Sequence, residues 1–458
     1  MTSGNIVLLI LGPLAALLTW SATLASGMND AAAITAGITV LCAIWWIFEP
    51  VPIPVTSLLP LALFQLFDVL TPDQIGASYG SSLILLLLGG FILSSAMERS
   101  GAHRRVALGM VNLFGGSSPR RLVFGFMTAA AVLSMWISNA ATTLMLLPVA
   151  IAVLQRNHDP ELEAPLLLGI AYAASVGGLG TPIGTPPNLV FREVFAVNTG
   201  VEIGFLTWMG WALPVVVLMV PVMGFWLTRS LKQVQSFDMP AVGHWQPAEK
   251  RVMVIFAITA IAWMTRAQPL GGWSELFGVP GTNDATVALI AAAAMFMVPD
   301  GNGQRLLDWD TAERIPWGML ILFGGGIAIA KAFTTSGLST AMGEALSALA
   351  SLPLLLMIVS ICLIITFMTE MTSNTATTTL MMPILAAAAL AAGIKPELLM
   401  VPAAMSASCA FMLPVATAPN TIVFSTGRFS IKAMARAGLV MNLLGVLVIS
   451  AVCYTILG

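Results

Sequence analysis

A short polar motif occurs twice in this chain, each time inside a long apolar stretch. The first copy covers 138–143 and reads Ser-Asn-Ala-Ala-Thr-Thr, and the second covers 373–378 and reads Ser-Asn-Thr-Ala-Thr-Thr, 235 positions later. Polar side chains are costly inside a membrane, and those that occur there are usually functional. Two copies at one spacing therefore indicate a duplicated half that keeps the motif for binding.

Each motif carries oxygen atoms that suit a hard cation such as Na⁺. A further hydroxyl stands four residues before each motif serine, at Ser134 before Ser138 and at Thr369 before Ser373. Positions i and i+4 share one face of a helix, and hard cations prefer oxygen ligands. The pattern predicts one Na⁺ site in each half. The alternative is that these hydroxyls bond only to carbonyl groups of their own helices.

Two other apolar segments, 164–191 and 398–427, are interrupted by proline and glycine. They share the pattern Thr-x-Pro-Asn, which begins at Thr185 in the first segment and at Thr417 in the second. Proline removes a helix hydrogen bond, and irregular backbone persists at membrane depth only beside protein or a wet cavity. We expect both spans to be broken in the middle. The carbonyl groups expected to be free beside the cation sites are those near Gly184 and Ala416.

The same segments contain hydrogen-bond donors for an anion. The amides of Asn139 and Asn374 and the hydroxyls of Thr185, Thr375 and Thr417 can hold carboxylate oxygens. No Lys or Arg lies in any of the four motif segments. A bound anion must therefore draw positive charge from helix N-termini and from bound cations. This favours cation–anion cotransport over anion uniport.

The composition indicates a membrane protein. Of the 458 residues, 58% are hydrophobic and 9% are charged, whereas an ordinary soluble domain has about 25% charged residues. The net charge of −2 gives no surface for nucleic acid. The predicted fold class is an all-α polytopic membrane protein with about eleven transmembrane helices, two re-entrant helical hairpins and two broken helices. Plain spans are expected at 6–25, 31–48, 52–69, 79–97, 205–229, 251–268, 284–299, 316–333 and 434–457.

Two apolar stretches are too long for one span. Residues 122–155 contain no charged residue, and 352–394 contain only Glu370. The first would be about 51 Å long as one straight helix, against a hydrocarbon core of about 30 Å. We expect hairpins that enter and leave on one side, each with its motif at the tip. Glu370, whose repeat partner is Met135, is expected to titrate in transport or to pair structurally with Lys331 or a tip amide.

The distribution of basic residues predicts the orientation. They cluster at 99–121, 229–251 and 428–436, and such clusters favour the cytoplasmic side. This places the N-terminus in the cytoplasm and the C-terminus outside, in the cell inner (plasma) membrane. The two hairpins then open to opposite sides, so that the halves form the inverted repeat of many secondary transporters. Segments 101–114 and 339–350 are amphipathic and are expected to be interfacial helices.

At these motifs the chain resembles the divalent anion:sodium symporter family, which comprises dicarboxylate and citrate transporters of the wider ion transporter superfamily. The segment 49–56 also resembles a family hallmark. The resemblance implies a homodimer that works as an elevator in the lipid bilayer and binds Na⁺ at two or more sites. It implies a fixed scaffold made of 1–117 and 251–351. The moving transport domain would comprise 118–250 and 352–458.

The resemblance also implies roles for single residues. One Na⁺ would contact Ser134, Ser138, Asn139 and Gly184, and the other would contact Thr369, Thr372, Asn374 and Ala416. Carboxylates of a small anionic substrate would meet Asn139, Ser373, Asn374, Thr375 and Thr417, with Ala140, Thr185 and Ala418 in the same site. Two of these positions depart from the family pattern. Ala140 replaces a threonine and removes one hydroxyl from the carboxylate site, and Ala418 stands where a proline is common.

The favoured function is Na⁺-coupled symport of a di- or tricarboxylate, of the succinate, malate, fumarate or citrate type, into the cytoplasm. The alternative on the same fold is a Na⁺-independent dicarboxylate exchanger or a transporter of divalent inorganic anions. An intramembrane enzyme or a channel is disfavoured. An enzyme needs a general base or a metal set in the membrane, and the polar motifs contain no His or Cys.

Overall fold

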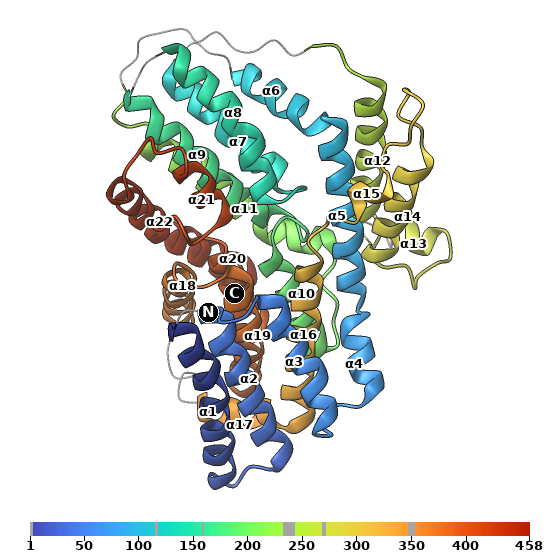
Figure 1. The fold of residues 1–458 in the computed structure, drawn as a ribbon, viewed down its shortest axis with the longest axis vertical. Helices are drawn as coiled ribbons and strands as arrows, with labels where there is room; N and C mark the ends of the chain where they lie inside the picture. The colour runs from blue at the N-terminus through green and yellow to red at the C-terminus, as the bar shows by residue number, and fades with distance from the viewer. Residues whose placement is uncertain (1–2, 115–117, 158–159, 232–242, 268–271, 347–352) are drawn as a thin grey trace.

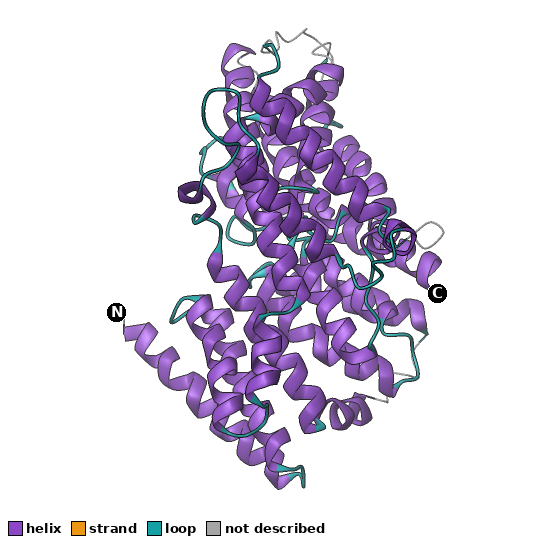
Figure 2. Ribbon diagram, turned by 90° about the vertical axis from the view of Figure 1, so that its right-hand side faces the viewer, coloured by secondary structure: helices purple, strands orange, loops and turns teal. Residues whose placement is uncertain are grey.

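The computed structural model describes residues 3–114, 118–157, 160–231, 243–267, 272–346 and 353–458. Within these ranges the regular secondary structure is helical, joined by turns and loops, apart from one isolated bridge between Pro299 and Arg305 (Figure 2). The all-α prediction is confirmed. The helices are α1 (Ser3–Ala25), α2 (Asp30–Phe48), α3 (Ile53–Leu66), α4 (Pro72–Tyr79), α5 (Ser82–Ser100), α6 (Ala102–Phe114), α7 (Pro119–Ser134), α8 (Asn139–Asn157), α9 (Pro160–Gly177), η1 (Gly178–Gly180), α10 (Pro186–Thr199), α11 (Phe205–Leu227), α12 (Pro247–Met264), α13 (Gly272–Leu276), α14 (Asp284–Met297), α15 (Trp309–Ala312), α16 (Trp317–Ser336), α17 (Leu338–Leu346), α18 (Leu354–Thr369), α19 (Asn374–Ala391), α20 (Glu397–Ala407), α21 (Ala418–Phe424) and α22 (Ile431–Leu457).

Eight helical segments in the described part of the chain are long and apolar enough to cross a membrane. The sequence predicted about eleven spans. The number of long apolar helices is smaller because several predicted spans form shorter helices. α3 and α14 have 14 residues each, and α20 has 11 residues. A helix of this length falls short of the roughly 20 residues that cover a bilayer core. The eight segments are Ile6–Ala25, Asp30–Phe48, Pro72–Ser100, Pro160–Gly180, Phe205–Leu227, Trp317–Ser336, Asn374–Ala391 and Ile431–Leu457.

Each predicted hairpin segment forms two helices with a short turn between them. α7 ends at Ser134 and α8 begins at Asn139, and α18 ends at Thr369 and α19 begins at Asn374. The two helices of each pair contact each other. The turns hold the start of each Ser-Asn motif, as the sequence predicts. Entry and exit on one side of a membrane stay a prediction for both pairs.

Both predicted broken spans are interrupted where proline and glycine occur. α9 ends at Gly177 and a single 3₁₀ turn follows before α10 begins at Pro186, while α20 ends at Ala407 and α21 begins at Ala418. We call residues 178–185 the first interruption and residues 408–417 the second interruption. Because these segments are not α-helical, their peptide groups need partners from other helices or from ligands.

The helix bounds recur at the spacing of the motifs. α7 and α18 coincide at both ends when residue numbers are shifted by 235, and α8 and α19 begin at matched asparagines. α6 (Ala102–Phe114) corresponds to one predicted interfacial helix, and α17 (Leu338–Leu346) to the start of the other, whose last residues, 347–350, lie outside the described residues. The inverted orientation of the two halves stays a prediction.

Helices from the two halves pack against one another. α10 contacts α19 and α20, and α21 contacts α8 and α9. In Figure 1, α1, α2, α3 and α17 lie toward one end of the molecule and α6 to α9 toward the other. Glycines permit close packing: a Cβ at Gly89 of α5 would lie 2.6 Å from the Ala288 Cβ of α14, and one at Gly325 of α16 would lie 2.4 Å from the Ser57 carbonyl oxygen of α3.

Candidate functional site

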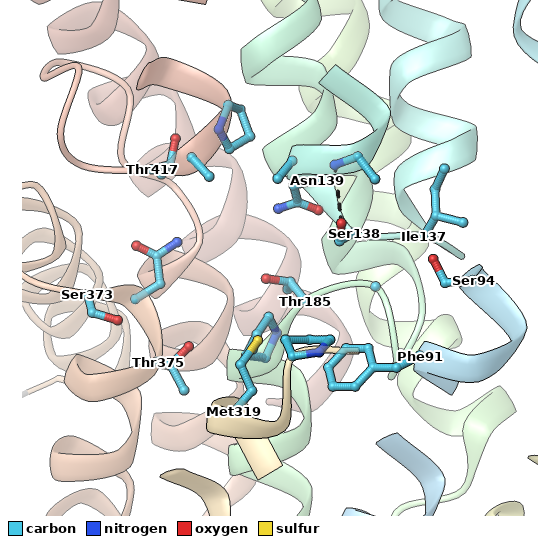
Figure 3. Close-up of a pocket in the computed structure, with 18 of the residues that line it drawn as sticks. Phe91, Ser94, Ile137, Ser138, Asn139, Thr185, Met319, Ser373, Thr375 and Thr417 are labelled. Carbon is cyan, nitrogen blue, oxygen red and sulfur yellow. Dashed lines mark hydrogen bonds between the residues drawn. The ribbon is translucent and has the colours of Figure 1, made fainter. Parts of the chain in front are cut away.

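The two Ser-Asn motifs and the two interruptions surround one cavity of about 810 Å³. In Figure 3, Ser138 and Asn139 lie on one side of it, Ser373, Thr375 and Thr417 lie on the other, and Thr185 lies between them. Both halves of the chain therefore build a single site. The structure brings together all residues predicted for substrate binding, and these lining residues are Asn139, Ala140, Thr185, Ser373, Asn374, Thr375, Thr417 and Ala418.

An oxygen-rich cluster lies beside the cavity in the first half. The hydroxyl of buried Ser134 donates a hydrogen bond of 2.6 Å to Asn139 Oδ1. A Cβ at Gly178 would lie 2.7 Å from this Oδ1 and 3.1 Å from the Gly184 carbonyl oxygen, so these atoms approach one point. Ser138 accepts a backbone N–H at the start of α8 and lines the cavity. The four residues predicted for the first Na⁺ thus lie close together.

The second half has an equivalent cluster. The Thr369 hydroxyl lies 2.8 Å from Asn374 Oδ1 and 3.0 Å from the Ala407 carbonyl oxygen. Thr369 is buried, whereas Asn374 and Ala416 line the cavity. The hydroxyl-to-asparagine contact therefore recurs at matched positions of the two helix pairs.

Thr372 behaves differently from the other predicted Na⁺ ligands. Its hydroxyl contacts the Met368 carbonyl oxygen at 2.9 Å and the Thr377 hydroxyl at 2.6 Å. Its side chain thus follows the alternative in which a hydroxyl bonds to its own helix. Thr372 lines the cavity.

Asn188 and Asn420 hold the two interruptions in shape. Asn188 Nδ2 donates to the carbonyl oxygens of Gly178, at 3.0 Å, and Thr181, at 2.8 Å. Asn420 Nδ2 donates to those of Ala410 and Leu413, both at 3.0 Å. Both asparagines are fully buried. Both residues belong to the Thr-x-Pro-Asn pattern, but the sequence predicted no role for them. A signal was available in the sequence, because each asparagine lies ten residues after a glycine- or alanine-rich segment.

Glu370 has partners other than those expected. Its carboxylate accepts backbone N–H groups of the second interruption, from Phe411 at 2.7 Å, Met412 at 2.9 Å and Leu413 at 3.0 Å. The Asn442 amide of α22 donates to it at 2.8 Å. The prediction of structural pairing was therefore right in kind, but the partners are neither Lys331 nor a tip amide. The span breaks next to this carboxylate and supplies free N–H groups to it.

Three charged residues that were not predicted from the sequence also line the cavity. They are Glu49, at the end of α2, Glu98, on α5, and Arg314, before α16. Arg314 is the one basic lining residue in the described part of the chain. Glu49 has a φ of +47°, which is uncommon for a residue with a side chain. Its place in the proline-rich segment 49–56 was the signal that pointed to it.

Apolar side chains complete the wall opposite the motifs. Phe91 and Met319 lie below Thr185 in Figure 3. Thr185 Oγ1 also lies 3.4 Å from Ser408 Oγ, so that the two interruptions meet beside the cavity. A few placed polar groups within a partly apolar cavity are typical of sites for small molecules.

Comparisons with known proteins agree with this arrangement. The sequence profile of the citrate transporter family (CitMHS) matches residues 43–399. A sodium-dependent dicarboxylate transporter, SdcS of Staphylococcus aureus (strain USA300), is 39% identical over 481 residues, which cover 100% of this chain and 92% of that protein. A second strain, MRSA252, has an SdcS with the same identity and coverage.

Two solved structures share the fold at low sequence identity. The YdaH transporter of Alcanivorax borkumensis matches with a TM-score of 0.61 and 16% identity over 86% of this chain and 88% of that one. MtrF of Neisseria gonorrhoeae matches with a TM-score of 0.62 and 14% identity over 85% and 83%. The relatives in sequence are transporters, so the chain is a transporter and not an enzyme. The family match establishes that this chain belongs to the citrate transporter family, and the full-length similarity to a sodium-dependent dicarboxylate transporter agrees with the divalent anion:sodium symporter family.

Proposed function

We propose that this chain couples Na⁺ entry to uptake of a C4-dicarboxylate, or of a related di- or tricarboxylate, into the cytoplasm. The observation that carries the proposal is the single cavity in which both Ser-Asn motifs face both interruptions. The similarity to a sodium-dependent dicarboxylate transporter along the whole chain supports both the ion and the substrate class.

The chemistry of the two asparagines supports coupling. Each presents its carbonyl oxygen to a hydroxyl cluster that suits a cation. The amide nitrogen of the same side chain is then the group left to donate to a carboxylate in the cavity. Asn139 and Asn374 would each contact both a Na⁺ and the anion, so that either ligand favours binding of the other.

We further propose that the segments 118–250 and 352–458 move together against 1–117 and 251–351, in a homodimer with a cytoplasmic N-terminus. The contacts of α10 with α19 and α20, and of α21 with α8 and α9, support the first group as one unit. A buried ion pair between Arg192 and Asp284, 2.7 Å long, joins the two groups in this conformation. Such a pair must break during an elevator movement.

Uptake of labelled succinate into proteoliposomes tests the proposed function. We expect accumulation under an inward Na⁺ gradient and none when K⁺ replaces Na⁺. Asn139→Ala and Asn374→Ala should each lower uptake by about 10- to 100-fold or more, as loss of metal-site groups does. Asn198→Ala is the matched control, because Asn198 bonds within α10 and does not line the cavity.

Equal uptake with and without Na⁺ would contradict coupling. Counterflow against internal dicarboxylate in Na⁺-free medium would then select the exchanger. MtrF is described as one of a class of antimetabolite efflux pumps, so the fold by itself leaves the direction open. Uptake measured against outward and inward gradients decides it.

A further inference from the structure

Glu370 is a buried carboxylate beside the second cation cluster that the transport chemistry leaves unused. It follows Thr369 directly at the end of α18, and its side chain is 4% exposed. Its hydrogen-bond partners in the described part of the chain are all donors: three consecutive backbone N–H groups, 411–413, and the Asn442 amide. A carboxylate with this many N–H donors holds them firmly, because bonds to a charged acceptor are the strong ones.

The bonds of Glu370 lead directly to the cavity. Leu413 donates its N–H to Glu370, and its carbonyl oxygen accepts the N–H of Ala416 at 3.2 Å and the Asn420 amide at 3.0 Å. Ala416 and the neighbouring Thr417 line the cavity. The backbone N–H and C=O groups of Leu413 thus connect the carboxylate to the wall of the site.

Thr369 and Glu370 together hold both ends of the segment 407–413. The Thr369 hydroxyl contacts the Ala407 carbonyl oxygen at 3.0 Å, where α20 ends. The Glu370 carboxylate takes the N–H groups at the far end of that segment. Two adjacent residues at the end of one helix therefore set the shape of the second interruption.

The other side of the second interruption packs closely on neighbouring helices. A Cβ at Gly438 of α22 would lie 2.1 Å from the Phe411 carbonyl oxygen, and Tyr172 of α9 donates to the same oxygen at 2.8 Å. Asn442, one turn after Gly438, both donates to Glu370 and accepts the Phe411 N–H at 3.2 Å. The segment therefore has little freedom as long as its N–H groups stay bonded.

We propose that Glu370 is a positioning residue for the second cation site. Its carboxylate fixes 411–413, and through Leu413 it places Ala416 and Thr417 against Asn374. The inference rests on the proposed Na⁺-coupled function. In it, Glu370 raises the Na⁺ affinity of the second cation site by holding the backbone of that site in place. Glu370 itself contacts neither ion nor substrate.

The test compares Glu370→Gln with the wild-type chain in proteoliposomes. The amide of glutamine offers one acceptor oxygen and turns an NH₂ group toward the remaining backbone donors, so the segment must shift. We expect the Na⁺ concentration for half-maximal uptake to rise about 10- to 100-fold, the usual effect of losing a group that orients a metal ligand. Uptake at saturating Na⁺ should recover most of its rate.

Two controls separate this role from general damage. Glu163→Gln removes a carboxylate from a partly exposed ion pair with Arg428 and should leave the Na⁺ dependence unchanged. Met135→Leu alters the matched position of the first half and should also leave the Na⁺ dependence of uptake unchanged. If Glu370→Gln fails to assemble, Asn442→Ala removes one bond of the same network and should raise the half-maximal Na⁺ concentration in the same direction by a smaller factor.

A second readout does not depend on transport. Val415, which is exposed and lines the cavity, is replaced by cysteine, and its labelling by a thiol reagent is measured as Na⁺ is titrated. We expect Na⁺ to protect this cysteine at lower concentration when Glu370 is present than in the Glu370→Gln background. An unchanged Na⁺ dependence in both readouts overturns the positioning role. Absence of any Na⁺ effect in the wild-type chain instead overturns the proposed function.

Discussion

The two interruptions occupy matched places in the two halves but are held by different forces. The first interruption is packed tightly through glycine. A Cβ at Gly177, the last residue of α9 before it, would lie 2.3 Å from the Ala131 carbonyl oxygen, and one at Gly184 would lie 2.4 Å from that of Gly178. Real side chains do not fit at these distances. In addition to the Asn188 bonds, the first interruption is therefore held by direct contact between backbone segments.

The second interruption has side chains where the first has glycine. At a shift of 232 residues, Cys409, Ala410 and Ala416 replace Gly177, Gly178 and Gly184. At these three positions the side chains prevent such close backbone contact, and Glu370 supplies hydrogen bonds to the segment instead. At the position of Glu370 the first half has Met135, whose Cε would lie 2.8 Å from a Cβ at Gly180.

This difference shows that a duplicated geometry can persist while its stabilising interactions diverge. The hydroxyl-to-asparagine contact at the helix turns and the asparagine-to-carbonyl bonds of the interruptions are retained in both halves. The surrounding support is not retained. At the matched positions, the first half should accordingly not tolerate added volume at its glycines, and the second half should not tolerate loss of its carboxylate.

The largest effect is expected from Glu370→Met, which copies the first half onto the second. Each buried polar group left unpaired costs about 1–3 kcal/mol. The Phe411 N–H keeps its bond to Asn442 Oδ1, so the other three donors would together cost at least about 3 kcal/mol. The apparent melting temperature in detergent measures this. Met135→Leu should change stability by less than about 1.5 kcal/mol. Equal losses in the two variants would contradict the difference between the halves.

Gly184→Ala should come next in magnitude. The added methyl group must displace the Gly178 carbonyl oxygen, 2.4 Å away, and overpacking of this kind costs about 1–3 kcal/mol. Since Gly184 lines the cavity, uptake should fall as well. The reverse change at the matched position, Ala416→Gly, should cost no more than about 1 kcal/mol. A stable, active Gly184→Ala variant would show that the first interruption is not held by close packing.

Asn188→Ala and Asn420→Ala test where the halves agree. Asn188→Ala takes the amide donor from three backbone carbonyl groups, and Asn420→Ala takes it from two. We expect similar losses of about 1–3 kcal/mol from each variant, measured by thermal unfolding in detergent. A loss of stability in only one of the two variants would show that the asparagine contacts, too, differ between the halves.

The smallest effect is expected at the motif position where the halves differ by one hydroxyl. Ala140 and Thr375 are matched and both line the cavity. One net hydrogen bond contributes about 1 kcal/mol, so Ala140→Thr should lower the KM for a dicarboxylate about fivefold and Thr375→Ala should raise it about fivefold. Uptake over a range of succinate concentrations measures both. A higher KM for Ala140→Thr and a lower KM for Thr375→Ala would show that the hydroxyl does not bind the substrate.

Much of the site was predicted from local sequence signals. The turns at 135–138 and 370–373 and the breaks at 178–185 and 408–417 follow from polar, glycine and proline residues in apolar surroundings, which constrain backbone conformation locally. The count of membrane-spanning helices was less accurate. Apolar composition continues past the ends of α3 and α14, but helix ends depend on turns and packing that composition does not record.

The sequence alone determined the helical class, the duplicated motifs and the residues that meet at the cavity, because these depend on residue type and on a spacing of 235. Only the tertiary structure decided the partners of Glu370 and the charged lining by Glu49, Glu98 and Arg314. Most of those contacts join segments distant in the chain. Their distances depend on how whole helices pack, which no local pattern specifies.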